Sequence, residues 1–203
     1  MNGFEKQELE TQGMMSRLFG SKPGHNALVE INNFLAESTA ATELTEEIVS
    51  NFIKNWGAKF DSSNIEYRSS MYRKVADHVY ISAVSKDDPV FEETKHLAQV
   101  LELPEKLQRL ADNGAKKVAY FSRCRKIISG EEPLTISEIN NVFGYDYEDG
   151  YDIRVQVFHD YLNKKFDEIA EQQRFSPDEE TALREICTKL DIPMNSNPIF
   201  KML

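Results

Sequence analysis

Cysteine is scarce in this chain of 203 residues, which contains only Cys124 and Cys187. A disulfide-stapled secreted scaffold needs many cysteines and a zinc knuckle needs a close pair of them, so the sequence fits neither class. We expect two reduced, partly buried thiols, the usual state of isolated cysteines in a cytoplasmic protein. Spacing alone leaves a long-range disulfide open.

Long apolar runs are also missing. No stretch approaches the about 20 apolar residues that a membrane-spanning helix needs. The first residues lack the apolar segment of a secretory signal. These two absences predict a cytoplasmic protein with no membrane span.

The common catalytic motifs are absent as well: the chain has no glycine-rich phosphate loop, no G-x-S-x-G elbow, no H-E-x-x-H and no C-x-x-C. No two of its four histidines have the i, i+4 spacing that places both on one helix face. We therefore predict a protein that is not an enzyme and holds no cofactor. Two alternatives stay open. One is a reactive Cys124, because Arg123, Arg125 and Lys126 beside it would lower the pKa of its thiol. The other is an active site assembled from distant residues.

Aromatic residues and acidic charge, in contrast, are plentiful. Hydrophobic residues make up 40% of the chain, and 12 Phe and 8 Tyr supply enough large side chains for a real core. The formal net charge is −10 and the pI is about 5.0. Because proteins bind nucleic acid by neutralising its phosphates with Lys and Arg, the charge argues against a nucleic-acid partner.

Apolar residues recur with a helical period along most of the chain after residue 25, and no segment has a convincing strand pattern. The sequence therefore predicts an all-α fold of about eight helices in a compact bundle. Local signals mark the helix boundaries. Asn113 and Gly114 are typical of a C-cap that ends a short helix. The expected helix starts are Thr45, Asp88 before Pro89, Thr135 with Glu138 in a capping box, and Ser176 before Pro177.

Two internal similarities suggest a duplication. Residues 30–33 and 138–141 share the sequence Glu-Ile-Asn-Asn, while residues 101–104 resemble residues 190–193 in a second, incompatible register. If the first similarity is a true duplication, the bundle consists of two pseudo-repeated helical lobes. The predicted division is an N-terminal arm and linker (1–25), a first lobe (26–104), basic connecting helices (105–133) and an acidic second lobe (134–203).

Charge is distributed unevenly along the chain. Residues 105–129 carry seven basic residues against two acids, whereas residues 131–180 carry fourteen acids against four basic residues. Three interpretations of the basic segment stay open: charge pairing within the molecule or with a second copy, binding of an anionic partner, or a solvated surface. The basic residues predicted to bind a partner are Lys116, Lys117, Arg123, Arg125 and Lys126.

Residues 145–152, called the acidic loop below, combine acids with tyrosines. Asp146, Glu148, Asp149 and Asp152 are candidate ligands of a divalent cation, because hard cations prefer several oxygens from one loop. The EF-hand register fails, since its first and third positions would fall on tyrosines. The alternatives that we favour are a solvated acidic loop or an acidic binding surface. The predicted partner anchors of such a surface are Tyr145, Tyr147 and Tyr151.

Residues 175–183 (FSPDEETAL), followed by Ile186, Leu190 and the pair Ile192-Pro193, resemble the helix entry of the tellurite-resistance TerB-like domains. The resemblance covers about a quarter of the chain. It implies an all-helical cytoplasmic module linked to metal and stress responses through acidic residues and protein contacts. Arg174 and Phe175 stand where the family has Asp-Gly, so no metal ligand is carried over.

These observations predict a non-enzymatic, cytoplasmic, helical protein–protein interaction module whose ligand is a protein partner or a second copy of the chain. Two alternatives remain. The first is an acidic decoy or inhibitor that occupies the basic groove of a nucleic-acid-binding partner. The second is a TerB-like module of metal or stress response.

Overall fold

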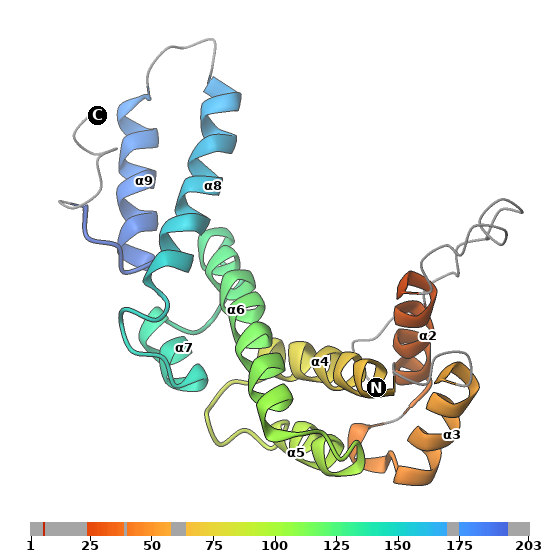
Figure 1. The fold of residues 1–203 in the computed structure, drawn as a ribbon. Helices are drawn as coiled ribbons and strands as arrows, with labels where there is room; N and C mark the ends of the chain where they lie inside the picture. Colours follow the sequence, from red (N-terminus) through yellow and green to blue (C-terminus); the bar gives the residue numbers. More distant parts are fainter. Residues whose placement is uncertain (1–5, 7–23, 39, 58–63, 170–174, 195–203) are drawn as a thin grey trace, which may run out of the picture. The chain divides into compact units, whose positions relative to one another are not determined.

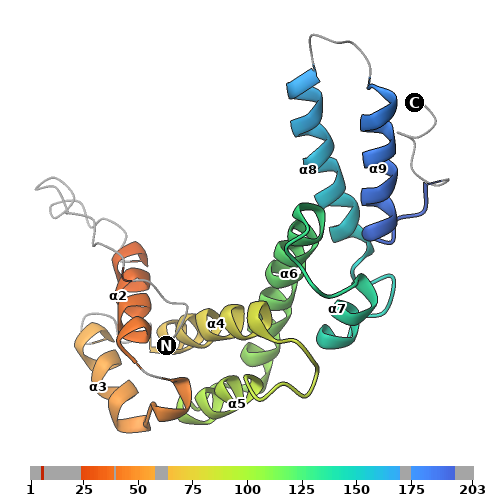
Figure 2. The same ribbon diagram turned by 180° about the vertical axis from the view of Figure 1, so that it is seen from behind.

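The computed structural model describes residues 6, 24–38, 40–57, 64–169 and 175–194. All regular structure in these residues is helical, which confirms the predicted all-α fold (Figures 1 and 2). The elements are α2 (Gly24–Glu37), the 3-10 turn η1 (Ala41–Glu43), α3 (Glu46–Gly57), α4 (Asn64–Ser82), α5 (Phe91–Val100), α6 (Glu105–Ser129), α7 (Ile136–Phe143), α8 (Tyr151–Ile169) and α9 (Pro177–Lys189).

Contacts divide the chain into two compact units. The N-terminal unit comprises Met1–Ser82 and Pro89–Ala115, and the C-terminal unit comprises Ala83–Asp88 and Lys116–Leu203. Helix α6 therefore gives its first part to one unit and its second part to the other. Every residue that the sequence singles out for partner or metal binding belongs to the C-terminal unit.

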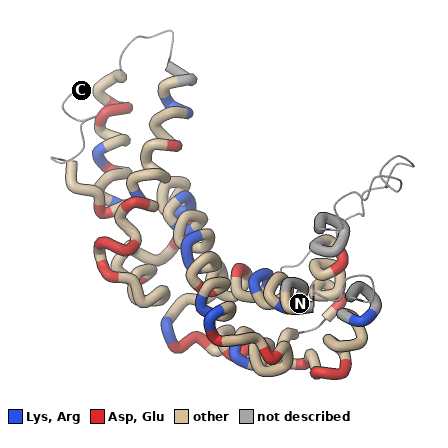
Figure 3. The backbone as a smooth tube through the Cα atoms, viewed as in Figure 1, with Lys and Arg blue, Asp and Glu red and all other residues tan. Residues whose placement is uncertain are grey.

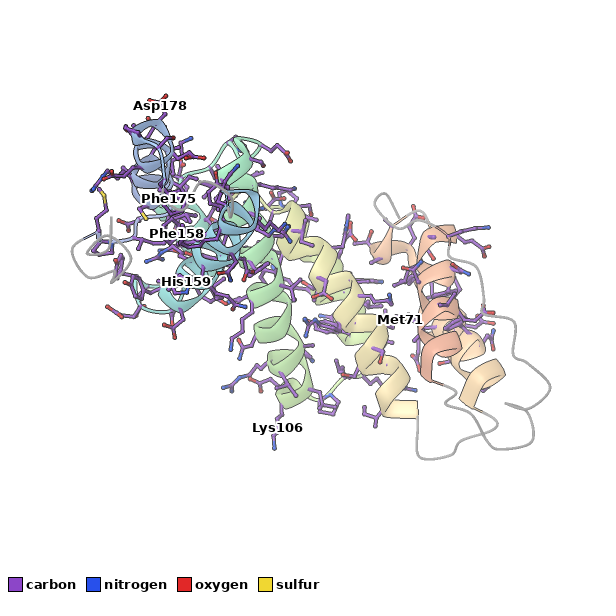
Figure 4. The ribbon with its side chains drawn as sticks, turned by 90° about the horizontal axis from the view of Figure 1, so that it is seen from above. Met71, Lys106, Phe158, His159, Phe175 and Asp178 are labelled. Carbon is purple, nitrogen blue, oxygen red and sulfur yellow. The ribbon has the colours of Figure 1, made fainter. Side chains whose placement is uncertain are left out.

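The core of the N-terminal unit forms where α4 packs against α2, α3 and α5. Its fully buried side chains include Leu35, Met71 and Leu97, and Met71 is labelled in Figure 4. His96 contributes a structural hydrogen bond, because its Nε2 lies 2.8 Å from the carbonyl oxygen of Leu44. The apolar faces that the sequence predicts for these helices therefore pack against one another in one core.

In the C-terminal unit, α8 and α9 lie side by side (Figures 1 and 2). Phe158 and Leu162 of α8 and Leu183 of α9 are buried. His159, next to Phe158 and labelled with it in Figure 4, is exposed. This helix pair and the second part of α6 position the residues considered below.

Three of the predicted helix starts are confirmed. The hydroxyl of Thr45 accepts a hydrogen bond from the Ile48 amide at 3.2 Å. Thr135 and Ser176 each form a complete capping box with the glutamate three residues later, and Pro177 occupies the first turn of α9. Capping residues act on amides of their own first turn, which is why local sequence identifies them.

Two predicted boundaries are wrong. Helix α6 continues through Asn113 and Gly114 without a break. Gly114 instead allows a close approach, because the guanidinium group of Arg73 fills the place of a Cβ. Asp88 does not cap α5, because this helix begins at Phe91. The Asp88 carboxylate instead accepts a hydrogen bond from the Val84 amide at 2.9 Å.

Helices α5 and α9 end in the same kind of turn. Glu102 and Asp191 both have positive φ angles, 46° and 52°. The amide of the following residue reaches back five positions, from Leu103 to the Ala98 carbonyl and from Ile192 to the Cys187 carbonyl. These bonds define Schellman caps in which an acid occupies the left-handed position that usually holds glycine. The likeness of residues 101–104 to residues 190–193 therefore has a local structural cause, while the predicted duplication stays a prediction.

Candidate functional site

A buried arginine joins the elements around the acidic loop. The Arg154 side chain is 0% exposed, and its Nη1 donates a hydrogen bond to the Tyr120 hydroxyl at 3.0 Å. That hydroxyl donates to Oδ1 of Asn140 at 2.8 Å, and Arg154 Nη2 donates to the Tyr147 carbonyl at 3.2 Å. The guanidinium carbon also lies 4.6 Å from the centre of the Tyr147 ring. Arg154 thus connects α6, α7, α8 and the acidic loop.

Glycine is required where this loop enters α8. A Cβ on Gly150 would lie 2.5 Å from the ring carbon that carries the hydroxyl of Tyr120. Because any larger residue would push Tyr120 away from Arg154, Gly150 permits the buried network.

The acids of the loop hold its backbone. The Asp149 amide donates to Asp146 Oδ1 at 2.9 Å, and the Asp146 amide donates to Asp149 Oδ2 at 3.0 Å. Glu148 and Asp152 are exposed. Among the described residues, no three acids, histidines or cysteines gather in a group that could hold a metal ion. The candidate cation ligands therefore lie together in sequence but do not form such a group in the structure.

The three predicted tyrosine anchors differ in exposure. Tyr145 is half-buried against Tyr120, with ring centres 5.4 Å apart, and burial raises the pKa of its phenol. Tyr151 is half-buried and its ring centre lies 5.6 Å from the Arg154 guanidinium carbon. Tyr147 keeps 39% of its surface exposed. Of the three, Tyr147 offers the most surface to a partner.

The predicted basic residues fall into two groups. Lys116 donates to the Phe143 carbonyl at 2.8 Å, so it caps the C-terminus of α7. Arg123 is buried, donates to the Ala83 carbonyl and lies 3.8 Å from the Glu132 carboxylate. Burial lowers the pKa of this guanidinium, against the opposing effect of Glu132. Both side chains stabilise the fold. The remaining three, Lys117, Arg125 and Lys126, are exposed on α6.

The exposed cations of α6 can be followed in Figure 3, and one of them borders a groove between α6 and α8. This α6/α8 groove has a volume of about 560 Å³. Buried Val157 and half-buried Ile128 and Tyr161 supply its apolar surface, while Arg125 and Lys164 bring a cation from each helix. Its lining residues are Arg125, Ile128, Ser129, Val157, Asp160, Tyr161, Asn163 and Lys164.

The two cysteines have the properties of core residues. Burial raises the pKa of Cys124 to about 12 and that of Cys187 to about 11, and both thiols are free. A reactive thiol needs a lowered pKa and access to solvent. The structure therefore gives no support to the reactive Cys124 considered above, whose basic neighbour Arg123 turns to the Ala83 carbonyl instead.

The hydrogen-bond network of this region was not predicted from the sequence. Its members are Arg154, Tyr120 and Asn140. A signal was available for Arg154, because it precedes the buried Phe158 and Leu162 at four-residue steps. A charged residue on the apolar face of a helix indicates a buried polar network.

The chain matches no family model, and comparison with curated proteins and with solved structures finds no similar protein. Among the described residues, no helix combines the length and the apolar character that crossing a membrane requires.

Proposed function

We propose that the chain is a non-enzymatic, helical protein-interaction module, and that its C-terminal unit binds an acidic segment of a protein partner in the α6/α8 groove. The observation that supports this proposal is the combination of Arg125 and Lys164 with the apolar surface of Ile128, Val157 and Tyr161. Interfaces are typically built this way, with an apolar and aromatic centre and charged residues at the rim.

The cations of the groove are available to a partner. Among the described residues, no ion pair joins Arg125 or Lys164 to a carboxylate, and Asp160 is the one acid in the groove lining. The ring of Tyr161 has a cation–π contact with Lys165, whose Nζ lies 6.0 Å from the ring centre. A ready-made aromatic surface beside unpaired cations favours an acidic ligand that also carries apolar side chains.

A second candidate is the acidic decoy, and the acidic loop supports it. Glu148 and Asp152 are exposed, and the mutual hydrogen bonds of Asp146 and Asp149 keep the loop in one conformation. A fixed row of carboxylates would compete with nucleic acid for a basic groove. Such binding would weaken strongly as salt is added. A TerB-like role stays the third alternative, supported only by the sequence resemblance.

The test is affinity capture from the native host with three baits: the wild type, R125E/K164E and the control K106E/R109E. Lys106, which extends from the first turn of α6 in Figure 4, and Arg109 are exposed, so the control changes the net charge by the same amount outside the groove. We expect wild type and control to retain a common partner that R125E/K164E loses. The purified partner would then be titrated calorimetrically against all three proteins. Equal affinity for all three would contradict the groove as the binding site.

A further inference from the structure

We infer that the acidic segment bound in the α6/α8 groove is the acidic loop of a second copy of this chain. This inference rests on the proposed function and adds the identity of the partner. It starts from a charge complementarity within the C-terminal unit: Arg125 and Lys164 line the groove, and acids crowd the loop between α7 and α8. The basic residues of α6 and the acids of this loop are blue and red in Figure 3.

The groove defines the kind of segment that it accepts. Arg125 and Lys164 come from two different helices, so a segment with two acids can place one carboxylate against each cation. Ile128 and Tyr161 between them require an apolar or aromatic side chain in the same segment. The occupant is therefore a short, acidic and aromatic stretch.

The acidic loop is such a stretch. Glu148 and Asp152 are exposed and neither forms an ion pair within the described part of the chain. Tyr147, 39% exposed, supplies the aromatic surface from a fixed position, because its ring lies over Arg154 and its hydroxyl donates to the Asp191 carbonyl at 3.3 Å. Because Arg154 and the Asp146–Asp149 turn already fix the loop, little conformational entropy is lost when it binds.

The loop does not reach the groove of its own molecule. Tyr145 packs on Tyr120 and the Tyr147 carbonyl is bound by Arg154, which fixes the loop at the N-terminal end of α8. Asp152 and Lys164 lie on the same helix, twelve residues apart. At 1.5 Å per residue, about 18 Å separates them along the helix axis. Pairing between these charges therefore requires two molecules.

Charge reversal in pairs provides the test. Sedimentation equilibrium would be measured over a wide concentration range for the wild type, for R125E/K164E and for E148K/D152K. The matched controls are K106E/R109E and E46K/E47K, the latter because Glu46 and Glu47 are also exposed acids in the first turn of a helix. Circular dichroism of each protein would establish that it is folded.

We expect the wild type and both controls to self-associate, and each test variant alone to associate about tenfold more weakly. An equimolar mixture of the two test variants should regain association, because each reversed groove then meets a reversed loop. Added salt should weaken the wild-type association. Failure of the mixture to regain association would overturn the inference.

A second measurement separates this inference from the proposed function. Fluorescence anisotropy would follow a labelled acidic, aromatic peptide of unrelated sequence added to the wild type and to R125E/K164E. If the wild type is monomeric at all concentrations but still binds the unrelated peptide through Arg125 and Lys164, the second copy is wrong and the groove is right. If the wild type is monomeric at all concentrations and the peptide does not bind either, both proposals are wrong.

Discussion

The Tyr120 hydroxyl is the connecting group of the buried network, and its removal tests whether that network stabilises the C-terminal unit. Tyr120 is 0% exposed, donates to Asn140 at 2.8 Å and accepts from Arg154 at 3.0 Å. The variant Y120F keeps the ring, and with it the contacts to Phe143 and Tyr145. It removes only the oxygen, so the buried Arg154 and the half-buried Asn140 each lose one hydrogen bond at once.

The expected loss follows from those two partners. A buried polar group left without a hydrogen bond costs about 1–3 kcal/mol. With Asn140 and Arg154 both affected, we expect Y120F to lower the free energy of unfolding by about 2–4 kcal/mol. The unit has fewer than about 100 residues, for which each kcal/mol corresponds to about 4–8 °C in the melting temperature. In an R154M background Tyr120 has one partner fewer, so the additional cost of Y120F should fall by about 1 kcal/mol or more.

Hydrogen exchange measured by mass spectrometry is the appropriate assay, because it reports α7 and α8 separately from the N-terminal unit. Urea unfolding followed by circular dichroism supplies the free energies for the double-mutant cycle. The control is Y145F, which removes the hydroxyl of a half-buried tyrosine that forms no side-chain hydrogen bond among the described residues. A Y120F protein within about 0.5 kcal/mol of the wild type, or a cycle without coupling, would refute the reasoning.

Three further predictions concern stability. G114A should change the free energy of unfolding by less than about 0.5 kcal/mol, because the gain in helix propensity is offset when Arg73 moves aside. In an R73A background the same substitution should stabilise the protein by about 1 kcal/mol, as urea unfolding can measure. Equal effects in both backgrounds would contradict this role of Arg73. E102G and D191G should each raise the free energy of unfolding by about 1 kcal/mol, because glycine adopts positive φ without strain. A lower melting temperature for either variant would contradict this expectation. Above pH 9 the unfolded chain loses the Cys124 proton, whereas the folded chain keeps it up to about pH 12. The contribution of the buried thiol to stability is therefore complete below pH 9 and is lost as the pH rises between these two values. Urea unfolding at several pH values should show a shallower alkaline decline for C124A, and an unchanged decline would contradict burial of the thiol.

The parts of the fold that could be predicted are those that depend on neighbours in sequence. The Ser176 and Thr135 capping boxes involve residues three positions apart, so reading the chain locally is enough to find them. The break expected at Gly114 shows the opposite case. Whether a glycine ends a helix or makes room for another side chain is decided here by Arg73, which lies 41 residues earlier in the sequence. Sequence patterns near Gly114 contain no information about that contact.

The same reasoning explains where the structure places the basic residues that were predicted to bind a partner. Ala115, Ala119, Arg123 and Ile127 follow one another at four-residue steps, and all four are buried. Arg123 therefore lies on the inner face of α6, where a charge must find internal acceptors, and it finds the Ala83 carbonyl and Glu132. Arg125 is only two positions further along, but a helix turns by about 200° over two residues, which places it on the outer face. Composition identified a basic segment, whereas the phase of the helix decides which of its charges are buried and which are exposed.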